Sequence, residues 1–228
     1  MIKNGFVKVN GETIKKPSFD VKFADKIEIY PPKLKKAIIP PDNSISAGYL
    51  KLQYIHEKTG LLSKADIVLD IGSSACGFVN YCAERVGFVY GIEISPEFLQ
   101  YISRANQREN VEVILGNAGN FDFSRFVRRG RAPDTVLIDL SVEPAFSLGI
   151  LRKIINIFQK NLKILLVLKG RYNKTSVKIL IHQFFRNDLG ILEIEHIIPG
   201  YRGKREVYII LRYIKTGDVS DRYQRNSI

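Results

Sequence analysis

Lys169 occupies a position where a charged side chain could do chemistry. It ends the apolar run KILLVLKG, which predicts a buried strand. In open parallel α/β sheets the carboxyl ends of the strands face the ligand crevice, so a lysine at such an end can be catalytic. The alternative is a lysine that only marks the solvated end of a strand, and the rest of the chain has to decide between the two.

A second candidate for chemistry is the stretch VLDIGSSACGF, a predicted strand followed by a small-residue turn and a helix. Such a turn lets backbone approach a ligand closely, and the N–H groups of the following helix point at it. The spacing of Gly72 and Gly77 matches neither the dinucleotide fingerprint nor a P-loop. Glu93 ends the next predicted strand, where an acidic side chain can accept hydrogen bonds from both hydroxyls of a ribose. Taken alone, Glu93 could equally be a surface charge, but beside this turn it favours a cofactor site.

The elements that must position these residues alternate from Ser44 onward. Predicted strands alternate with helical stretches, which indicates βαβ units and a mostly parallel sheet. A helix is expected at residues 47–58, and another begins with Ser95 as N-cap and Pro96 at its first position. The strands are expected at ADIVLDIG, FVYGIEI, VEVILG, DTVLIDL, KILLVLKG, ILEIEHIIP and EVYIILRYI. The last two have no helix between them, so the sheet is expected to end in an antiparallel hairpin.

Domain boundaries follow from changes in composition along the chain. Residues 1–30 read as short β elements with a turn at Asn10 and Gly11, and residues 31–43 form a linker rich in proline and lysine. Residues 44–215 form the main α/β domain. Residues 216–228 are expected to be a flexible polar tail.

Composition and charge narrow the class of protein. The 228 residues suffice for one α/β domain and a small appendage, and the net charge of +12 suggests a polyanionic partner, most often nucleic acid. Two cysteines and three histidines form no metal-ligand cluster or disulfide framework and suit a reducing cytosol. Neither a signal peptide nor a membrane span is visible, so we expect a soluble, cytoplasmic protein.

The turn after the first strand resembles motif I of the S-adenosylmethionine-dependent methyltransferases, an acidic residue followed by spaced glycines. This resemblance implies a Rossmann-like methyltransferase fold, a mostly parallel seven-stranded sheet with an antiparallel last strand. It also implies S-adenosylmethionine as the cofactor. The implied cofactor contacts are Asp70, Gly72, Ser73, Ser74, Gly77, Phe78, Glu93, Ile94, Asn117, Ala118 and Asp139.

Four residues in chain order resemble the Lys-Asp-Lys-Glu tetrad of the FtsJ-like ribose methyltransferases: Lys51, Asp139, Lys169 and Glu206. The stretch SAGYLKL is similar to S-R-G-G-x-K-L of the TlyA or hemolysin A branch, with Ala47 in place of the arginine. Gly170 stands where that branch has proline. The resemblance covers essentially the whole chain and implies an RNA ribose methyltransferase. The alternative for the four residues is two ordinary surface ion pairs.

The implied reaction passes positive charge from sulfur to the attacking ribose oxygen, so a group must orient the hydroxyl and take its proton. A lysine can do this if desolvation or a second ammonium lowers its pKa, as Lys51 beside Lys169 would. We therefore expect Lys169 to accept the proton or steer the hydroxyl. Asp139 and Glu206 would position it, Lys51 would contribute positive charge, and no metal is required.

Residues 1–30 resemble the second half of the alpha-L RNA-binding domain, a ribosomal S4-like module, through Gly5, Val7, Val9, Asn10 and Gly11. The two helices that precede this half in the family are missing, so the module is expected to be partial; a hairpin that only caps the structure is the alternative. Tyr201 could stack on a splayed base. The expected RNA contacts are Lys8, Lys33, Lys35, Lys36, Arg128, Arg129, Tyr201, Arg202, Lys204 and Arg205.

The resemblance favours methylation of a ribose 2′-hydroxyl in rRNA. Alternatives are a tRNA ribose methyltransferase, or a non-catalytic RNA-binding or ribosome-assembly factor that keeps the methylase fold. The intact tetrad and glycine turn argue against a pure binding protein. A pore-forming hemolysin is disfavoured because the sequence has no amphipathic or membrane-spanning segment.

Overall fold

The computed structural model describes residues 7–16, 18, 19, 22, 27–29, 46–186 and 190–215. The chain divides into two compact units, Met1–Ser44 and Ile45–Ile228. The expected linker at 31–43 and tail at 216–228 lie outside the described residues. Within the described part, none of the helices is long and apolar enough to cross a membrane.

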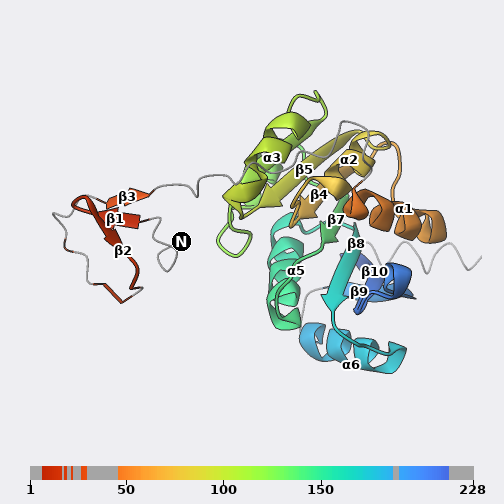
Figure 1. The fold of residues 1–228 in the computed structure, drawn as a ribbon. Helices are drawn as coiled ribbons and strands as arrows, with labels where there is room; N and C mark the ends of the chain where they lie inside the picture. The colour runs from red at the N-terminus through yellow and green to blue at the C-terminus, as the bar shows by residue number, and fades with distance from the viewer. Residues whose placement is uncertain are drawn as a thin grey trace, which may run out of the picture. The chain divides into compact units, whose positions relative to one another are not determined.

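The first unit contains a small antiparallel sheet (Figure 1). Strands β1 (Val7–Val9), β2 (Glu12–Ile14) and β3 (Ile27–Ile29) pair in the order β2-β1-β3. Asn10 and Gly11 join the first two strands with φ angles of 52° and 87°. Positive φ at both central residues is the requirement of a tight two-residue hairpin turn, which asparagine and glycine tolerate best. The expected hairpin is therefore confirmed.

The second unit is built on a seven-stranded sheet with the order β6-β5-β4-β7-β8-β10-β9. All pairs from β6 to β8 are parallel, and β10 is antiparallel to both of its neighbours. This confirms the mostly parallel sheet and its terminal antiparallel hairpin. The strands are β4 (Ile67–Ile71), β5 (Phe88–Glu93), β6 (Val111–Leu115), β7 (Thr135–Ile138), β8 (Leu162–Lys169), β9 (Ile191–Pro199) and β10 (Glu206–Ile214).

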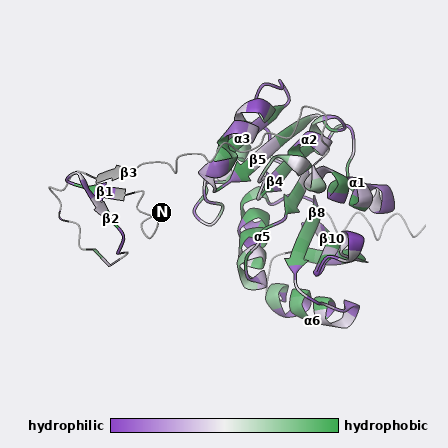
Figure 2. Ribbon diagram, in the orientation of Figure 1, coloured by the Kyte–Doolittle hydropathy of each residue, from purple (hydrophilic) through white to green (hydrophobic). Residues whose placement is uncertain are grey.

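Helices cover both faces of this sheet (Figure 1). One apolar cluster joins the sheet to α1 (Ala47–Thr59), α2 (Gly77–Ala83) and α3 (Leu99–Ala105). The other joins it to α4 (Ser124–Arg128), α5 (Pro144–Phe158) and α6 (Lys174–Phe185). Neighbouring strand residues such as Val68 and Leu69 belong to opposite clusters, because successive side chains point to opposite faces of a sheet. Figure 2 shows the resulting hydrophobic strands between helices with hydrophilic outer surfaces.

Two local details differ from the sequence expectation. Ser95 is the N-cap as expected, but the helix opens with a 3-10 turn (Pro96–Phe98) and the Ser95 side chain makes no capping bond. The Ser95 N–H instead donates to Glu93 Oε1 at 2.7 Å. The polar segment after β6 contains the short helix α4, which its charge pattern did not indicate.

The two ends of the sheet have different chemistry. The parallel strands deliver Gly72, Glu93, Asp139 and Lys169 just at or after their carboxyl ends. β10 runs the opposite way, so its first residue, Glu206, pairs in register with the last residue of β8. The fold therefore gathers four charged side chains, from β5, β8, β10 and the residue after β7, beside the turn at Gly72.

Candidate active site

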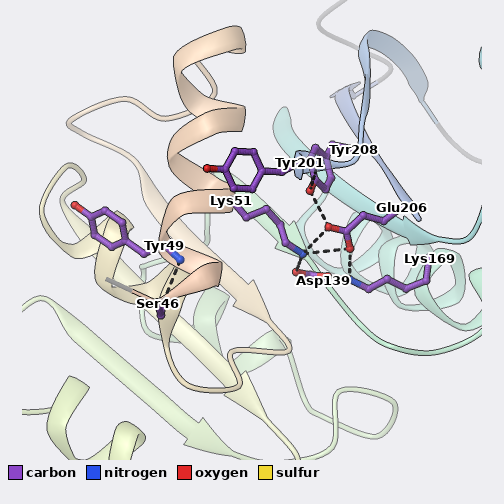
Figure 3. A network of polar contacts seen from close by, with 8 residues as sticks. All are labelled: Ser46, Tyr49, Lys51, Asp139, Lys169, Tyr201, Glu206 and Tyr208. Carbon is purple, nitrogen blue, oxygen red and sulfur yellow. Dashed lines mark hydrogen bonds and ion pairs between the residues drawn. The ribbon is translucent and has the colours of Figure 1, made fainter. Parts of the chain in front are cut away.

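Lys51, Asp139, Lys169 and Glu206 meet in one network of ion pairs (Figure 3). Lys51 Nζ lies 2.5 Å from Asp139 Oδ2 and 3.2 Å from Glu206 Oε1. Lys169 Nζ lies 2.5 Å from Asp139 Oδ1 and 2.7 Å from Glu206 Oε2. Each carboxylate thus bridges both ammonium groups. Since each lysine contacts both carboxylates, the alternative of two separate surface ion pairs is wrong.

The network is largely withdrawn from water, least so at Lys169. The side chains of Lys51 and Glu206 are 6% and 5% exposed, whereas that of Lys169 is 31% exposed. The rings of Phe78 and Tyr208 lie 5.7 and 5.8 Å from Lys51 Nζ. Lys169 is therefore the ammonium that a substrate can reach, and Lys51 is the buried charge that balances the carboxylates.

The pKa of Lys169 departs from the sequence expectation. Burial disfavours its charged form, but the charges and hydrogen bonds of Asp139 and Glu206 outweigh burial and raise the pKa above its ordinary value. The expected lowering of the pKa by a second ammonium is wrong. Both carboxylates contact Lys169 Nζ, at 2.5 and 2.7 Å, and favour its charged form. In the free protein Lys169 is a proton donor that holds its charge.

Beside the network lies a cavity of about 530 Å³ at the carboxyl ends of β4 to β7. Asp139 belongs to both the network and the cavity wall. Of the expected cofactor contacts, seven line it, namely Gly72, Ser74, Glu93, Ile94, Asn117, Ala118 and Asp139. Leu140, Ser141, Val142, Phe98 and Phe146, which the sequence did not single out, complete much of the wall.

Glu93 fits a ribose. Its buried carboxylate accepts the backbone N–H of Ser74 through Oε2 at 2.7 Å and that of Ser95 through Oε1 at 2.7 Å. An ionised carboxylate has about four acceptor positions, so each oxygen can still accept one hydroxyl. The same bonds tie the glycine turn to the end of β5. Glu93 therefore holds the loop in place and keeps acceptor positions that a cofactor ribose could use.

Asp70 also fits a cationic cofactor. Both of its carboxylate oxygens are buried and have no hydrogen-bond partner among the described residues. Burial raises its pKa from 3.8 to about 7, against the opposing influence of the nearby Ser73 hydroxyl, and the charges of Asp139 and Glu93 add to the rise. Asp70 directly precedes Ile71 and Gly72 of the cavity wall. A carboxyl group without a partner in the described part of the chain could at this place pair with the positively charged groups of S-adenosylmethionine, which would favour its ionised form.

The remaining expected cofactor contacts do not line the cavity. A Cβ on Gly77 would stand 2.5 Å from Ser46 Oγ and 2.8 Å from Tyr49 N, so this glycine allows α1 and α2 to pack closely. Phe78 is buried beneath Lys51, and the Ser73 hydroxyl donates to the Asp70 carbonyl at 3.3 Å. Gly77, Phe78 and Ser73 therefore support the loop and the network through packing and a hydrogen bond, without lining the cavity.

Substitution of Asp70 by asparagine is expected to stabilise the free protein, increasingly as pH rises. The folded state keeps the Asp70 proton up to about pH 7, whereas the unfolded chain loses it near 3.8. Stability due to this group is thus lost as pH rises through that window. The gain in free energy of unfolding for Asp70→Asn should be larger at pH 8 than at pH 5 by roughly 2 kcal/mol. Urea unfolding at both pH values measures it, and an equal effect at both would contradict the buried unpaired state.

Residues expected to contact RNA fall into distinct places. Arg202, Lys204 and Arg205 are exposed on the turn between β9 and β10, directly before Glu206. Tyr201 begins the 3-10 turn Tyr201–Gly203 there, and its ring lies 5.1 Å from that of Tyr54 on α1. We call residues 200–205 the basic turn. It adjoins the network, as the sequence suggested.

Two further expected RNA contacts, Arg128 and Arg129, are not part of the network and pair with other carboxylates. Arg128 pairs with Asp122 at 2.7 Å, and Arg129 pairs with Glu112 at 2.9 Å. Arg128 is the last residue of α4 and Arg129 follows it, and both precede β7 at its amino end. Lys8 belongs to β1 of the first unit, whereas Lys33, Lys35 and Lys36 lie outside the described residues.

Gly170 explains the absence of proline after Lys169. Its φ angle is 126°, which proline cannot adopt, and its N–H donates to the Arg205 carbonyl at 2.8 Å. This hydrogen bond ties the carboxyl end of β8 to the basic turn. Tyr208 is a further residue that sequence reasoning missed. Its place two residues after Glu206 on the same strand, hence on the same face, was the available signal.

This fold and cavity define an S-adenosylmethionine-dependent methyltransferase. The family model for FtsJ-like methyltransferase matches residues 45–179, and that for the S4 domain matches residues 1–27. The chain belongs to the FtsJ-like methyltransferase family, whose cofactor is S-adenosylmethionine. The S4 match links it to RNA.

Individual relatives agree with this assignment. A candidate hemolysin from Streptococcus thermophilus has a TM-score of 0.59 and 16% identity, covering 99% of this chain and 90% of that chain. A methyltransferase from Aquifex aeolicus that depends on S-adenosylmethionine has a TM-score of 0.52 and 16% identity, covering 75% of this chain and 95% of that chain. Both show the shared fold. The ribosomal RNA small subunit methyltransferase A described for Pyrococcus furiosus is 27% identical over 96 residues, which are 41% of this chain and 35% of that protein. This chain thus matches about a third of that relative's length.

Proposed function

We propose that the protein methylates a ribose 2′-hydroxyl of ribosomal RNA. The observation that carries the proposal is the network of two ammonium and two carboxylate groups against the cofactor cavity. Asp139 belongs to both, so a hydroxyl held by the network would lie next to the cofactor. Such a site suits the delivery of a hydroxyl oxygen rather than a metal-bound nucleophile. Among the described residues, no cluster of metal ligands accompanies it.

The chain's own residues can hold the hydroxyl and receive its proton. When bound, S-adenosylmethionine supplies an electrophilic methyl group on a positively charged sulfur. Two of the three N–H groups of Lys169 donate hydrogen bonds to Asp139 and Glu206. The third can donate to the ribose oxygen and orient it. An oxygen that gains positive charge becomes strongly acidic, and the Asp139 carboxylate, which contacts Lys169 Nζ, could accept its proton. The raised pKa of Lys169 thus favours steering over proton abstraction.

Surfaces near the network support an RNA substrate. The exposed cations of the basic turn, Arg202, Lys204 and Arg205, can contact phosphates beside the target nucleotide. Tyr201 and Tyr54, with Lys58 Nζ 5.1 Å from the Tyr54 ring, offer an aromatic platform for an unstacked base. The S4 module would add affinity for RNA. These features favour a target in a loop or bulge, where a base can leave its stack.

Transfer of a tritiated methyl group tests this function. Purified protein would be incubated with labelled S-adenosylmethionine and, separately, with ribosomal subunits, protein-free ribosomal RNA and bulk tRNA. We expect label in ribosomal RNA or subunits. Label confined to tRNA would establish the tRNA alternative. Cofactor and RNA binding without label in any sample would show a non-catalytic assembly factor.

A further inference from the structure

Tyr208 is a buried tyrosine that touches the network without belonging to the tetrad. Its side chain is fully buried, and its hydroxyl donates to Glu206 Oε1 at 2.7 Å. The same hydroxyl accepts the backbone N–H of Tyr201 at 2.8 Å (Figure 3). Burial and the adjacent carboxylate raise the pKa of Tyr208 far above its ordinary value, so it remains a donor. One hydroxyl therefore joins the first residue of the 3-10 turn to a network carboxylate.

The basic turn has a tightly determined shape, so a change at its surface would reach this hydroxyl. A Cβ on Gly200 would stand 2.2 Å from the Lys204 carbonyl oxygen and 2.8 Å from that of Glu206. Arg202 is held in the left-handed region with φ 53°. The Glu206 N–H donates to the Lys204 carbonyl at 2.9 Å. The backbone of the basic turn packs tightly against that of Glu206, so a shift of the turn is expected to move Glu206.

We infer that Tyr208 is a positioning residue that fixes the Glu206 carboxylate and couples it to the basic turn. The inference rests on the proposed function, because it assigns the coupling a role in holding Lys169 for the substrate hydroxyl. Glu206 faces Lys51 from α1, Lys169 from β8 and Tyr208 from its own strand, and Asp139 faces the same two lysines. RNA phosphates bound by the basic turn would thereby help Glu206 to hold Lys169, which orients the substrate hydroxyl.

The decisive variant is Tyr208→Phe, which keeps the ring and removes the hydroxyl. Burial raises the pKa of Glu206, but hydrogen bonds from Lys169 and Tyr208 outweigh it and hold the pKa at about 2. Loss of the Tyr208 bond is expected to shift the Glu206 titration upward, as followed by carbon NMR of labelled glutamate. We also expect kcat for RNA methylation to fall about tenfold, with KM for RNA changed less than about twofold.

Tyr201→Ala provides the matched contrast because it keeps the backbone N–H and removes the ring. It is expected to raise KM for RNA about tenfold and leave the Glu206 titration in place. Gly200→Ala displaces the turn with Tyr208 intact, so it should move the Glu206 titration if Tyr208→Phe fails to fold. Tyr90→Phe, a buried tyrosine on β5, controls for loss of a phenol from the core and should match the wild type.

The possible outcomes separate the inference from the proposed function. An unchanged Glu206 titration in a folded Tyr208→Phe or Gly200→Ala protein would overturn the coupling, whatever the activity. A tenfold rise in KM with unchanged kcat in Tyr208→Phe would also overturn it, since that pattern describes an RNA contact. A wild-type protein that transfers no methyl group would overturn the function, while the titration would still report on the coupling.

Discussion

Replacing Lys169 with alanine is expected to lower kcat for RNA methylation by about 10³-fold and to leave cofactor affinity within about twofold. The variant removes the more accessible ammonium of the network, whose third N–H is proposed to hold the substrate oxygen. Lys169 is absent from the cavity wall, so the cofactor should bind as before. Single-turnover kinetics with labelled cofactor, together with calorimetric titration of the cofactor, measures both quantities.

A matched control comes from the opposite end of the same strand. Lys163, also on β8, pairs with Asp66 at 2.6 Å, far along the strand from Lys169. Lys163→Ala is expected to cost some stability and leave kcat unchanged. Methylation at the wild-type rate by folded Lys169→Ala would remove Lys169 from the mechanism. A loss of cofactor affinity as large as the loss of kcat would assign it to binding instead.

Replacing Glu93 with alanine is expected to raise the dissociation constant for S-adenosylmethionine about 100-fold. The change removes the acceptor proposed for the ribose hydroxyls and also leaves the N–H groups of Ser74 and Ser95 without their present partner. Two hydrogen bonds to a charged group are worth roughly 3 kcal/mol together, which corresponds to this factor. Calorimetry or equilibrium dialysis gives the constant directly.

Two further variants separate binding from loop disorder. Glu93→Gln keeps one carbonyl acceptor for the loop and loses the charge, so its effect should be intermediate. Glu112→Ala removes a carboxylate at the start of neighbouring β6, where it pairs with Arg129, and should bind cofactor normally. Wild-type affinity in folded Glu93→Ala would contradict the placement of the ribose at Glu93.

Strand ends were the most predictable part of the molecule. Apolar runs with short turns between them fix where parallel strands stop, and parallel strands must place those stops at one edge. For that reason Lys169 and Glu93 could be predicted as site residues from the strand ends, whereas Asp139 was assigned through the resemblance to the tetrad. The hairpin at Asn10 and Gly11 was equally readable because few residues tolerate its φ angles.

Electrostatics within the site could not be read from the sequence. The direction of the Lys169 pKa depends on which charges lie nearest, and the contacts of Asp139 and Glu206 at 2.5 and 2.7 Å decide it. The sequence predicts that two lysines and two carboxylates share one site, but it does not show which lysine contacts which carboxylate. The sequence indicated opposing effects of a second ammonium and of two carboxylates on the pKa of Lys169, and only the contacts show that the carboxylates prevail.

Long-range packing was also beyond a single sequence. The role of Gly77 depends on how closely α1 crosses α2, and the engagement of Arg129 depends on Glu112 from another strand. Neither distance follows from local spacing. Tyr208 looked like one more core aromatic in EVYIILRYI, because only its hydrogen bonds to Glu206 and Tyr201 distinguish it.

The chemical position of the transferred methyl group tests the central claim most directly. Ribosomal RNA labelled by the wild-type protein would be digested to nucleosides and separated by mass spectrometry, with RNA from the Lys169→Ala reaction as the blank. The account predicts that the added methyl mass stays with the ribose fragment when the glycosidic bond is broken. A methyl group that stays with the base would contradict a network built to present a ribose hydroxyl.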